Sequence, residues 1–342
     1  MRSPSSCVPT WCVVSPAIVG CPDTLSDPVL GTTIEWGSAS RARTPFTLCR
    51  RSWLGMQGNP APGRPAAGYR VFSSPAMAGR GQVVDQSGFG PFGVCPITLP
   101  ENMTVNSTGS IDTAGEHLAR FLTYLHTDKG IDDVDLVGHS MGGLYSRAAI
   151  RVLTTTNSPV HVRSLTTIGT PWQGSYLSDY ANDVVPLTDC AGDQFCENAM
   201  KSFRAEVLHL VSGSGREVNQ AYLMGKDGWN QFQAGVLDKI PVVLIGGKKF
   251  TRPGQVNPLV WPNDGVVALR SALAVDIADS VLPHRRCYTF DDTHSIYVSN
   301  AAGLDWKTAL TWDPQVFDVL HTAIEDAPKA LDGSNRENCP TS

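Results

Sequence analysis

The residues best suited to covalent chemistry lie at 138–142, where the sequence Gly-His-Ser-Met-Gly fits a Gly-x-Ser-x-Gly pattern. A short apolar run (133–137) precedes the pattern and a helix-forming run (141–153) follows it. A serine at such a turn takes a strained backbone conformation, and the flanking glycines remove Cβ atoms that would clash. The N-terminus of the following helix stabilises a developing oxyanion. The pattern predicts Ser140 as nucleophile and the N–H of Met141 as oxyanion donor; the alternative is a Gly/Ser turn without chemistry.

A serine hydroxyl needs a base, usually a histidine that a carboxylate orients. In a chain that alternates strands and helices, the acid and then the histidine follow the serine. Five of the eight histidines precede either the serine or the strand that should carry the acid. Of the other three, His284 lies before the last strand and His321 lies within a helix, whereas His294 directly follows the strand at 287–290. Active sites gather at such carboxyl ends. We predict His294 as the base; the alternative is a structural loop histidine.

The acid must come from the carboxylates that follow the strand at 241–245. These are Asp264, Asp276, Asp279, Asp291 and Asp292. The second and third fall in an apolar helical stretch and should lie on its solvated face. The last two are so close to the histidine in sequence that the chain would have to fold back on itself. Asp264, in the loop Asn-Asp-Gly-Val-Val (263–267), is therefore the predicted acid; the alternative is an N-cap before Val266.

The elements that must position these residues follow from hydrophobic periodicity. Apolar residues recur at helical spacing over 115–126, and a last helix over 314–326 has Asp313 as N-cap and Pro314 at its first position. Short apolar strands are predicted at 133–137, 162–168, 241–245 and 287–290. Strands that alternate with helices predict an α/β fold whose parallel strands are joined by right-handed crossovers.

Composition excludes several functional classes. The 342 residues are 42% hydrophobic and 17% charged, with a net charge of -5, which excludes a disordered chain or a coiled coil. No basic block points to nucleic acid, and no apolar run reaches the length of a membrane span. No metal-ligand spacing is present, and we predict neither a metal nor an organic cofactor. The oligomeric state stays open.

The nine cysteines suit a secreted, disulfide-bonded protein better than a cytosolic one. Cys190 and Cys196 are close enough in sequence to form a bridge, and Cys287 and Cys339 offer a second pair that would tie down the C-terminal tail. Sequence alone does not settle the connectivity. We expect an extracellular location, although residues 8–19 lack the clean apolar run of a signal peptide.

Four segments together resemble the lipases of the α/β-hydrolase superfamily. They are GHSMGG (138–143), GTPWQGS (169–175), NDGVV (263–267) and THS (293–295). They look like the segments of bacterial and fungal triacylglycerol lipases, and the resemblance covers about 95–326. It implies an α/β-hydrolase fold, with a mostly parallel central sheet, helices on both faces and a helical lid-type insertion. It also implies hydrolysis of a lipid or other ester through an acyl-enzyme, for a substrate presented at an oil–water interface.

The N-terminal part carries a second resemblance. Residues 21–33 (CPDTLSDPVLGTT) look like the opening of the secreted lipase group that includes Candida antarctica lipase B. Carried over, this resemblance implies Thr32 as the second oxyanion donor and a Cys21–Cys95 bridge. Val29-Leu30 is too short for a full strand, and 34–65 matches nothing in the family. That segment is either a genuine insertion or a disturbed part of the coding sequence.

The expected organisation has three parts. An irregular N-terminal arm (1–68) carries the oxyanion loop, a hydrolase domain (69–330) contains the insertion at about 171–235, and a tail (331–342) follows. The insertion is either a lid over the acyl chain or an ordinary packed helical excursion. Two functional alternatives to ester hydrolysis stay open: an acyltransferase with the same triad, and an inactive relative that acts as a binding protein.

Overall fold

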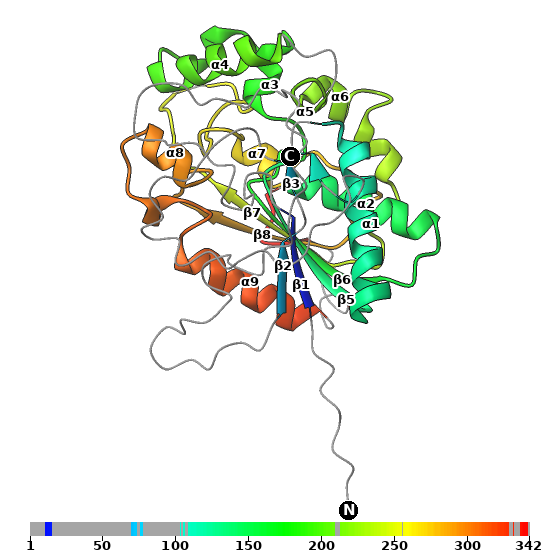
Figure 1. Cartoon of the computed structure of the whole chain (residues 1–342). Coiled ribbons are helices and arrows are strands. Elements are labelled where there is room, and N and C mark those ends of the chain that lie inside the picture. The colour runs from blue at the N-terminus through cyan, green and yellow to red at the C-terminus, as the bar shows by residue number, and fades with distance from the viewer. Residues whose placement is uncertain are drawn as a thin grey trace, which may run out of the picture.

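A parallel β-sheet runs through the middle of the molecule (Figure 1). The computed structural model describes residues 11–15, 70–73, 76–77, 103, 105–106, 109–208, 213–254, 256–327, 331 and 336–340. Within them the sheet has seven strands in the order β2-β1-β5-β6-β7-β8-β9. Their bounds are β1 Trp11–Ser15, β2 Arg70–Ser73, β5 Asp133–His139, β6 His161–Ile168, β7 Val242–Gly247, β8 Arg285–Phe290 and β9 Arg336–Glu337. A separate parallel pair joins β3 (Ala76–Met77) to β4 (Val105–Asn106).

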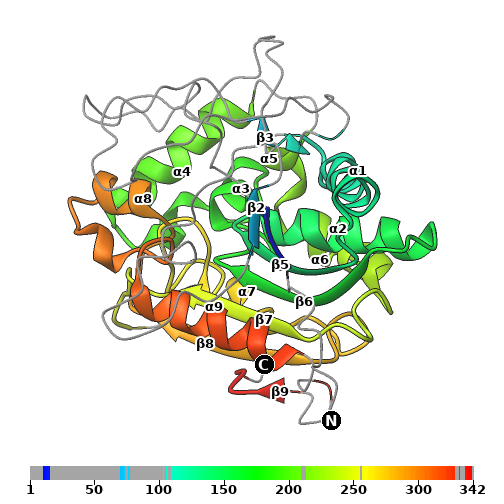
Figure 2. The same ribbon diagram turned by 60° about the horizontal axis from the view of Figure 1, so that its bottom comes forward.

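Helices cover both faces of this sheet. Helices α1 (Ile111–Lys129) and α2 (Gly142–Thr155) lie on one face and α9 (Pro314–Asp326) lies on the other (Figure 2). Side chains alternate between the faces along each strand. Leu136 of β5 therefore joins the core beneath α1 and α2, while its neighbour Val137 packs with Leu320 of α9. This two-sided burial explains why the predicted strands have no polar face.

The helices and strands predicted from residue 115 onward are confirmed, with shifts at their ends. Helix α9 spans the predicted residues, and Asp313 caps it by accepting a hydrogen bond from the N–H of Gln315 at 2.8 Å. Helix α1 begins four residues earlier than predicted, because Ile111 and Ala114 are also buried. It ends at Gly130, whose left-handed φ of 65° stops the helix.

The N-terminal arm differs from the prediction. Residues 11–15, expected to be irregular, form β1, which lies between β2 and β5 in the sheet and pairs in parallel with both. The strand was missed because its short apolar run stands between Pro9 and Pro16 and has no periodicity of its own. The strand next to the serine-bearing strand β5 is therefore formed by residues 11–15, which precede Val29-Leu30 in the chain.

The excursion between β6 and β7 is helical. Its elements are α3 (Tyr176–Ala181), η3 (Leu187–Cys190), α4 (Gln194–Val207), α5 (Ser214–Glu217), α6 (Gln220–Met224) and η4 (Trp229–Gln233). Cys190 and Cys196 form the predicted bridge. Leu177 and Met200 belong to a separate apolar cluster that also includes Trp261 from the loop after β7. The excursion is thus anchored to the loop that carries Asp264. Among the described residues, no helix is long and apolar enough to cross a membrane.

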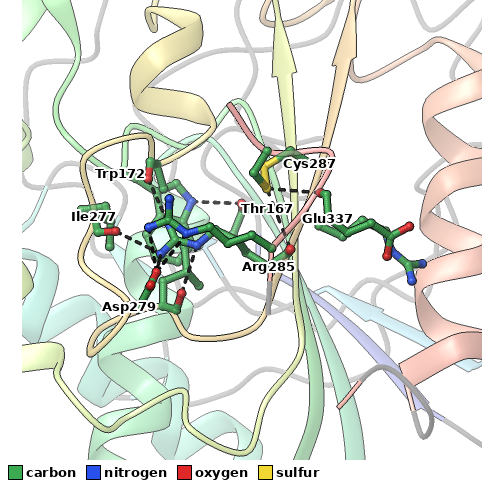
Figure 3. The surroundings of a disulfide bond; sticks show 12 residues. Thr167, Trp172, Ile277, Asp279, Arg285, Cys287 and Glu337 are labelled. Carbon is green, nitrogen blue, oxygen red and sulfur yellow. Dashed lines mark hydrogen bonds and ion pairs between the residues drawn. A yellow bond between two sulfur atoms is a disulfide. The ribbon is translucent and has the colours of Figure 1, made fainter. Parts of the chain in front are cut away.

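Short helices complete the second half: α7 (Leu269–Ala272), α8 (Ile296–Ala301) and η5 (Trp306–Thr308). Part of the expected tail forms the edge strand β9, and Cys339 bonds to Cys287 of β8 as predicted (Figure 3). This disulfide spans 52 residues of sequence.

Candidate active site

Ser140 lies at the sharp turn between β5 and α2. Its φ of 54° is left-handed, which confirms the predicted strain, and its N–H donates to the carbonyl of Ile168 at 2.8 Å. A Cβ at Gly138 would lie 2.5 Å from the backbone nitrogen of Gly143, and a Cβ at Gly143 would lie 2.3 Å from Oγ1 of Thr170. Only glycine fits at these two positions. Met141 is the N-cap residue of α2, so its backbone stands at the positive end of that helix.

Asp264 and His294 meet in the loops that follow β7 and β8. Nδ1 of His294 donates to Oδ2 of Asp264 at 2.8 Å, and the backbone N–H of His294 donates to the carbonyl of Asp264 at 2.7 Å. Both side chains are fully buried. Nε2 of His294 is also buried and has no hydrogen-bond partner within the described part of the chain. Because the carboxylate holds Nδ1–H, the neutral ring leaves Nε2 as the acceptor for a proton.

The second oxygen of Asp264 has a structural task. Oδ1 accepts hydrogen bonds from the N–H groups of Val266 at 3.0 Å and Val267 at 2.8 Å. The turn resembles the N-cap that was the alternative interpretation, but no helix starts there, since α7 begins only at Leu269. One carboxylate thus closes its own loop with one oxygen and bonds the imidazole with the other.

The segment 169–176 contacts the serine turn, the acid and the histidine. Gly169 has a φ of 57°, and a Cβ there would lie 2.9 Å from Nδ1 of His294 and 3.1 Å from Oδ2 of Asp264. Oγ1 of Thr170 donates to the carbonyl of Ser140 at 2.7 Å. Ser175 and Tyr176 donate to backbone carbonyls in the turn after Asp264 at 2.6 and 2.7 Å. The sequence motif at 169–175 by itself indicates no role for these residues. Their contacts with the serine turn, the acid and the histidine are seen only in three dimensions.

The rejected candidates are engaged elsewhere. Asp276 pairs with Arg270, Asp279 with Arg285 and Arg336, Asp291 with Lys249, and His321 with Glu325. His284 stands just before β8, where its carbonyl accepts from the N–H of Val242 at 3.0 Å. Each lies in a local structural contact, so the elimination made on chain order agrees with the geometry.

Asp292 is the unexpected group near the site. It is buried two residues before His294 and faces the carboxylate of Asp313. Burial, followed by the negative charge of Asp313, raises the pKa of Asp292 to about 7, against the opposing effect of Lys249. At neutral pH this carboxyl is therefore partly protonated, unlike a typical aspartate.

Two predictions of the sequence analysis fall outside the described residues. They are the second oxyanion donor, Thr32, and the Cys21–Cys95 bridge. Among the residues that the structure does describe, no three His, Cys, Asp or Glu side chains group in a way that could hold a metal ion.

Comparison with known proteins matches part of the chain to a family model and to curated relatives. Residues 112–271 match the model of the PGAP1-like alpha/beta domain family. A triacylglycerol lipase of Pseudarthrobacter phenanthrenivorans is 41% identical over 78 residues, which is 23% of this chain and 23% of the relative. A triacylglycerol lipase of Burkholderia plantarii is also 41% identical over 78 residues, 23% of this chain and 20% of that one. The matched segment spans less than a quarter of either relative.

Among solved structures, a Bacillus licheniformis lipase in its propeptide form has a TM-score of 0.46 at 16% identity, covering 100% of this chain and 54% of that one. The parallel sheet with helices on both faces, and the left-handed serine at the turn after β5, define the class of fold: the chain has an α/β-hydrolase fold. Within that class, its sequence similarity is to triacylglycerol lipases.

Proposed function

We propose that this protein hydrolyses carboxylic esters through Ser140, His294 and Asp264. The observation that supports the proposal most is the buried 2.8 Å bond between Nδ1 of His294 and Asp264, with Nε2 of the same ring left without a partner among the described residues. A histidine in this state accepts a proton at Nε2 and shares its charge with the carboxylate. The strained Ser140, at the turn after β5, is the group that would supply this proton.

The reaction proceeds in two balanced steps. Ser140 Oγ attacks the ester carbonyl carbon while its proton passes to Nε2 of His294, and Asp264 stabilises the imidazolium. The alcohol then leaves with that proton, and an acyl group remains on Ser140. Water then attacks the acyl carbonyl carbon and gives a proton to Nε2 of His294; the acyl–Ser140 bond breaks, the acid is released, and Ser140 Oγ takes the proton back from His294. The N–H of Met141, at the start of α2, donates to the oxyanion in both steps. Thr32 stays our prediction for the second donor.

We propose lipid esters as the substrates. The matched relatives bear the name triacylglycerol lipase. The helical excursion at 171–235 is our candidate for the wall or lid of the acyl-chain site, because its apolar cluster packs against the turn of Asp264. The hydrolase domain would then comprise 69–330 together with β1.

We propose an extracellular location. Within the described part of the chain, Cys190 is bonded to Cys196 and Cys287 to Cys339. Disulfides form and persist in oxidising compartments, and the cytosol keeps most thiols reduced.

The test is hydrolysis of p-nitrophenyl butyrate and p-nitrophenyl palmitate by the wild type and by Ser140→Ala. We expect turnover by the wild type and a loss of about 10⁵–10⁶ in kcat in the variant. The ratio between the two chain lengths separates an esterase from a lipase. A fluorophosphonate probe should label the wild type and not Ser140→Ala. A folded wild type that neither turns over nor reacts with the probe would support a binding protein, and transfer of the acyl group to an added alcohol in preference to water would support an acyltransferase.

A further inference from the structure

His139 is the last residue of β5 and the residue just before Ser140. Its side chain is 2% exposed and points toward the loop of His294. Nε2 of His139 lies 3.0 Å from the backbone carbonyl oxygen of His294, and the centroids of the two imidazole rings lie 4.7 Å apart. The residue beside the nucleophile thus contacts the residue that carries the base, 155 positions later in the chain.

The chemistry of this contact fixes the state of His139. A carbonyl oxygen only accepts hydrogen bonds, so Nε2 of His139 carries the hydrogen. Burial and the nearby His294 lower the pKa of His139 to about 3. His139 is therefore a neutral donor at physiological pH, and it does not take part in the proton transfers assigned to His294.

The backbone of His294 is held at both ends of the residue. Its N–H donates to the carbonyl of Asp264 at 2.7 Å, and its carbonyl accepts from His139. The first bond ties the base to the acid, and the second ties it to the strand that ends at Ser140. Without the second bond, the loop would keep its register with Asp264 but lose its fixed distance to the serine.

We propose that His139 is a positioning residue, which sets the place of the His294 imidazole relative to Ser140 through the hydrogen bond to the His294 carbonyl. The inference rests on the proposed function for its kinetic consequence, while the geometric part stands on the contact itself. It follows that the amide-bearing variant His139→Gln, which can place an N–H near the Nε2 position, should preserve the arrangement. His139→Leu and His139→Asn should lose it, since leucine has no donor and the asparagine amide is too short to reach.

The kinetic test compares these three variants on p-nitrophenyl butyrate. For His139→Leu and His139→Asn we expect kcat to fall about 10–100-fold with KM within about twofold, because a displaced base slows the chemistry and leaves substrate binding intact. His139→Gln should stay within about threefold of the wild type. The matched control is Ser164→Ala, which removes another buried hydrogen bond of the same sheet, from Ser164 Oγ to Asp135 Oδ1 at 2.7 Å. It should lower the unfolding temperature and leave kcat unchanged.

The structural test does not depend on hydrolysis. The Nδ1–H proton of His294, bonded to Asp264, should give a low-field proton NMR signal in the wild type and in His139→Gln, and a shifted or broadened one in His139→Leu and His139→Asn. A wild type without esterase activity would overturn the proposed function, and the NMR comparison would still decide the positioning role. Activity of His139→Leu or His139→Asn within about twofold of the wild type, or an equal activity loss in Ser164→Ala, would overturn the inference.

Discussion

The two ends of β8 each bury a basic side chain, and the two side chains are satisfied in different ways. Arg285 opens the strand, and His294 follows its last residue in the next loop. Nε and Nη1 of Arg285 donate to the carbonyls of Leu282 and Ala274 at 3.0 and 3.1 Å, and Nη2 donates to the carbonyl of Ile277 and to Oδ1 of Asp279 (Figure 3).

The His294 end is left incomplete. One ring nitrogen is bonded to Asp264, and Nε2 is buried without a partner among the described residues. Burying a polar atom without a hydrogen bond costs about 1–3 kcal/mol. Nε2 therefore destabilises the folded state unless a substrate or a transition state forms a hydrogen bond with it. The difference between the ends indicates which buried group serves folding and which is kept ready for chemistry.

Arg147 shows that an unpaired atom alone does not identify a site. This arginine of α2 is fully buried, and its three guanidinium nitrogens have no hydrogen-bond partner among the residues that the structure describes. Its guanidinium lies 4.1 Å from the ring centroid of Trp172 and 4.8 Å from that of Trp229. Two aromatic faces offset part of the desolvation, which nevertheless lowers the pKa of Arg147 to about 9. What distinguishes His294 is its hydrogen bond to the Asp264 carboxylate and the presence of the strained Ser140 at the same carboxyl-end edge of the sheet.

After Ser140→Ala, the largest expected effect is that of Asp264→Asn. The asparagine amide would no longer accept from Nδ1–H and would favour the wrong tautomer of His294, so we expect kcat to fall by about 10⁴. Steady-state kinetics with p-nitrophenyl butyrate gives the measurement. Asp279→Asn, at the opposite end of β8, is the control and should keep wild-type kcat. Equal losses in the two variants would mean that the ends of β8 do not differ in role.

Arg285→Met should act on stability instead of turnover. It removes the guanidinium donors from the carbonyls of Ile277 and Leu282 and leaves the carbonyl of Ala274 with only the N–H of Ile277. We expect the free energy of unfolding to fall by about 3–5 kcal/mol. Urea unfolding followed by tryptophan fluorescence measures the loss. Arg286→Met, at the next residue, removes two partly exposed ion pairs, with Glu337 and Asp326, and should cost about 0–1 kcal/mol. If kcat, calculated per folded molecule, were lower in Arg285→Met than in the wild type, Arg285 would not have a purely structural role.

Gly169→Ala tests how closely the backbone approaches the acid and the base. The new Cβ would press on Nδ1 of His294, and we expect kcat to fall about 10–100-fold, because small displacements of a catalytic group are costly. Gly130→Ala is the matched control. Gly130 also has a left-handed φ, but a Cβ there meets nothing within 4 Å. Both variants should lose about 1–2 kcal/mol of stability from backbone strain, and only the first should lose activity.

The smallest expected effect is a contrast in pH dependence between the two ends. The pKa of Asp292 is raised, so between about pH 4 and pH 7 the folded state binds a proton that the unfolded state lacks, and stability falls as pH rises. The stability of Asp292→Asn should therefore gain on that of the wild type as pH rises over this range.

At the other end, hydrogen bonds from Arg336 and the charges of Arg336 and Arg285 lower the pKa of Asp279. Its contribution is present above the unfolded-state pKa of 3.8 and is lost as pH falls through the folded-state value. The deficit of Asp279→Asn should thus shrink below about pH 4. Urea unfolding from about pH 3 to about pH 8 provides both curves. Parallel curves for the two variants would refute the opposite shifts.

Local sequence patterns predicted an element correctly where the residue types in them favour a single kind of structure. Apolar runs without a polar face predicted β5, β6, β7 and β8, and the Asp313-Pro314 pair predicted the start of α9. Chain order and strand ends were enough to select Asp264 and His294, which the structure places 2.8 Å apart. The same reasoning failed at β1, because a five-residue apolar run between prolines has no period that separates strand from loop.

The sequence by itself determined the α/β pattern, the serine turn and the two candidate partners of the serine. It offered both observed disulfide pairs without settling their connectivity. These features depend on local spacing, on backbone sterics and on the rule that parallel strands present their carboxyl ends at one edge. Only the tertiary structure decided that His139 contacts the carbonyl of His294, that Gly169 lies against the acid and the base, and that Asp264 divides its two oxygens between loop and imidazole. Such contacts join residues far apart in the chain, and their distances are set by packing that no local pattern encodes.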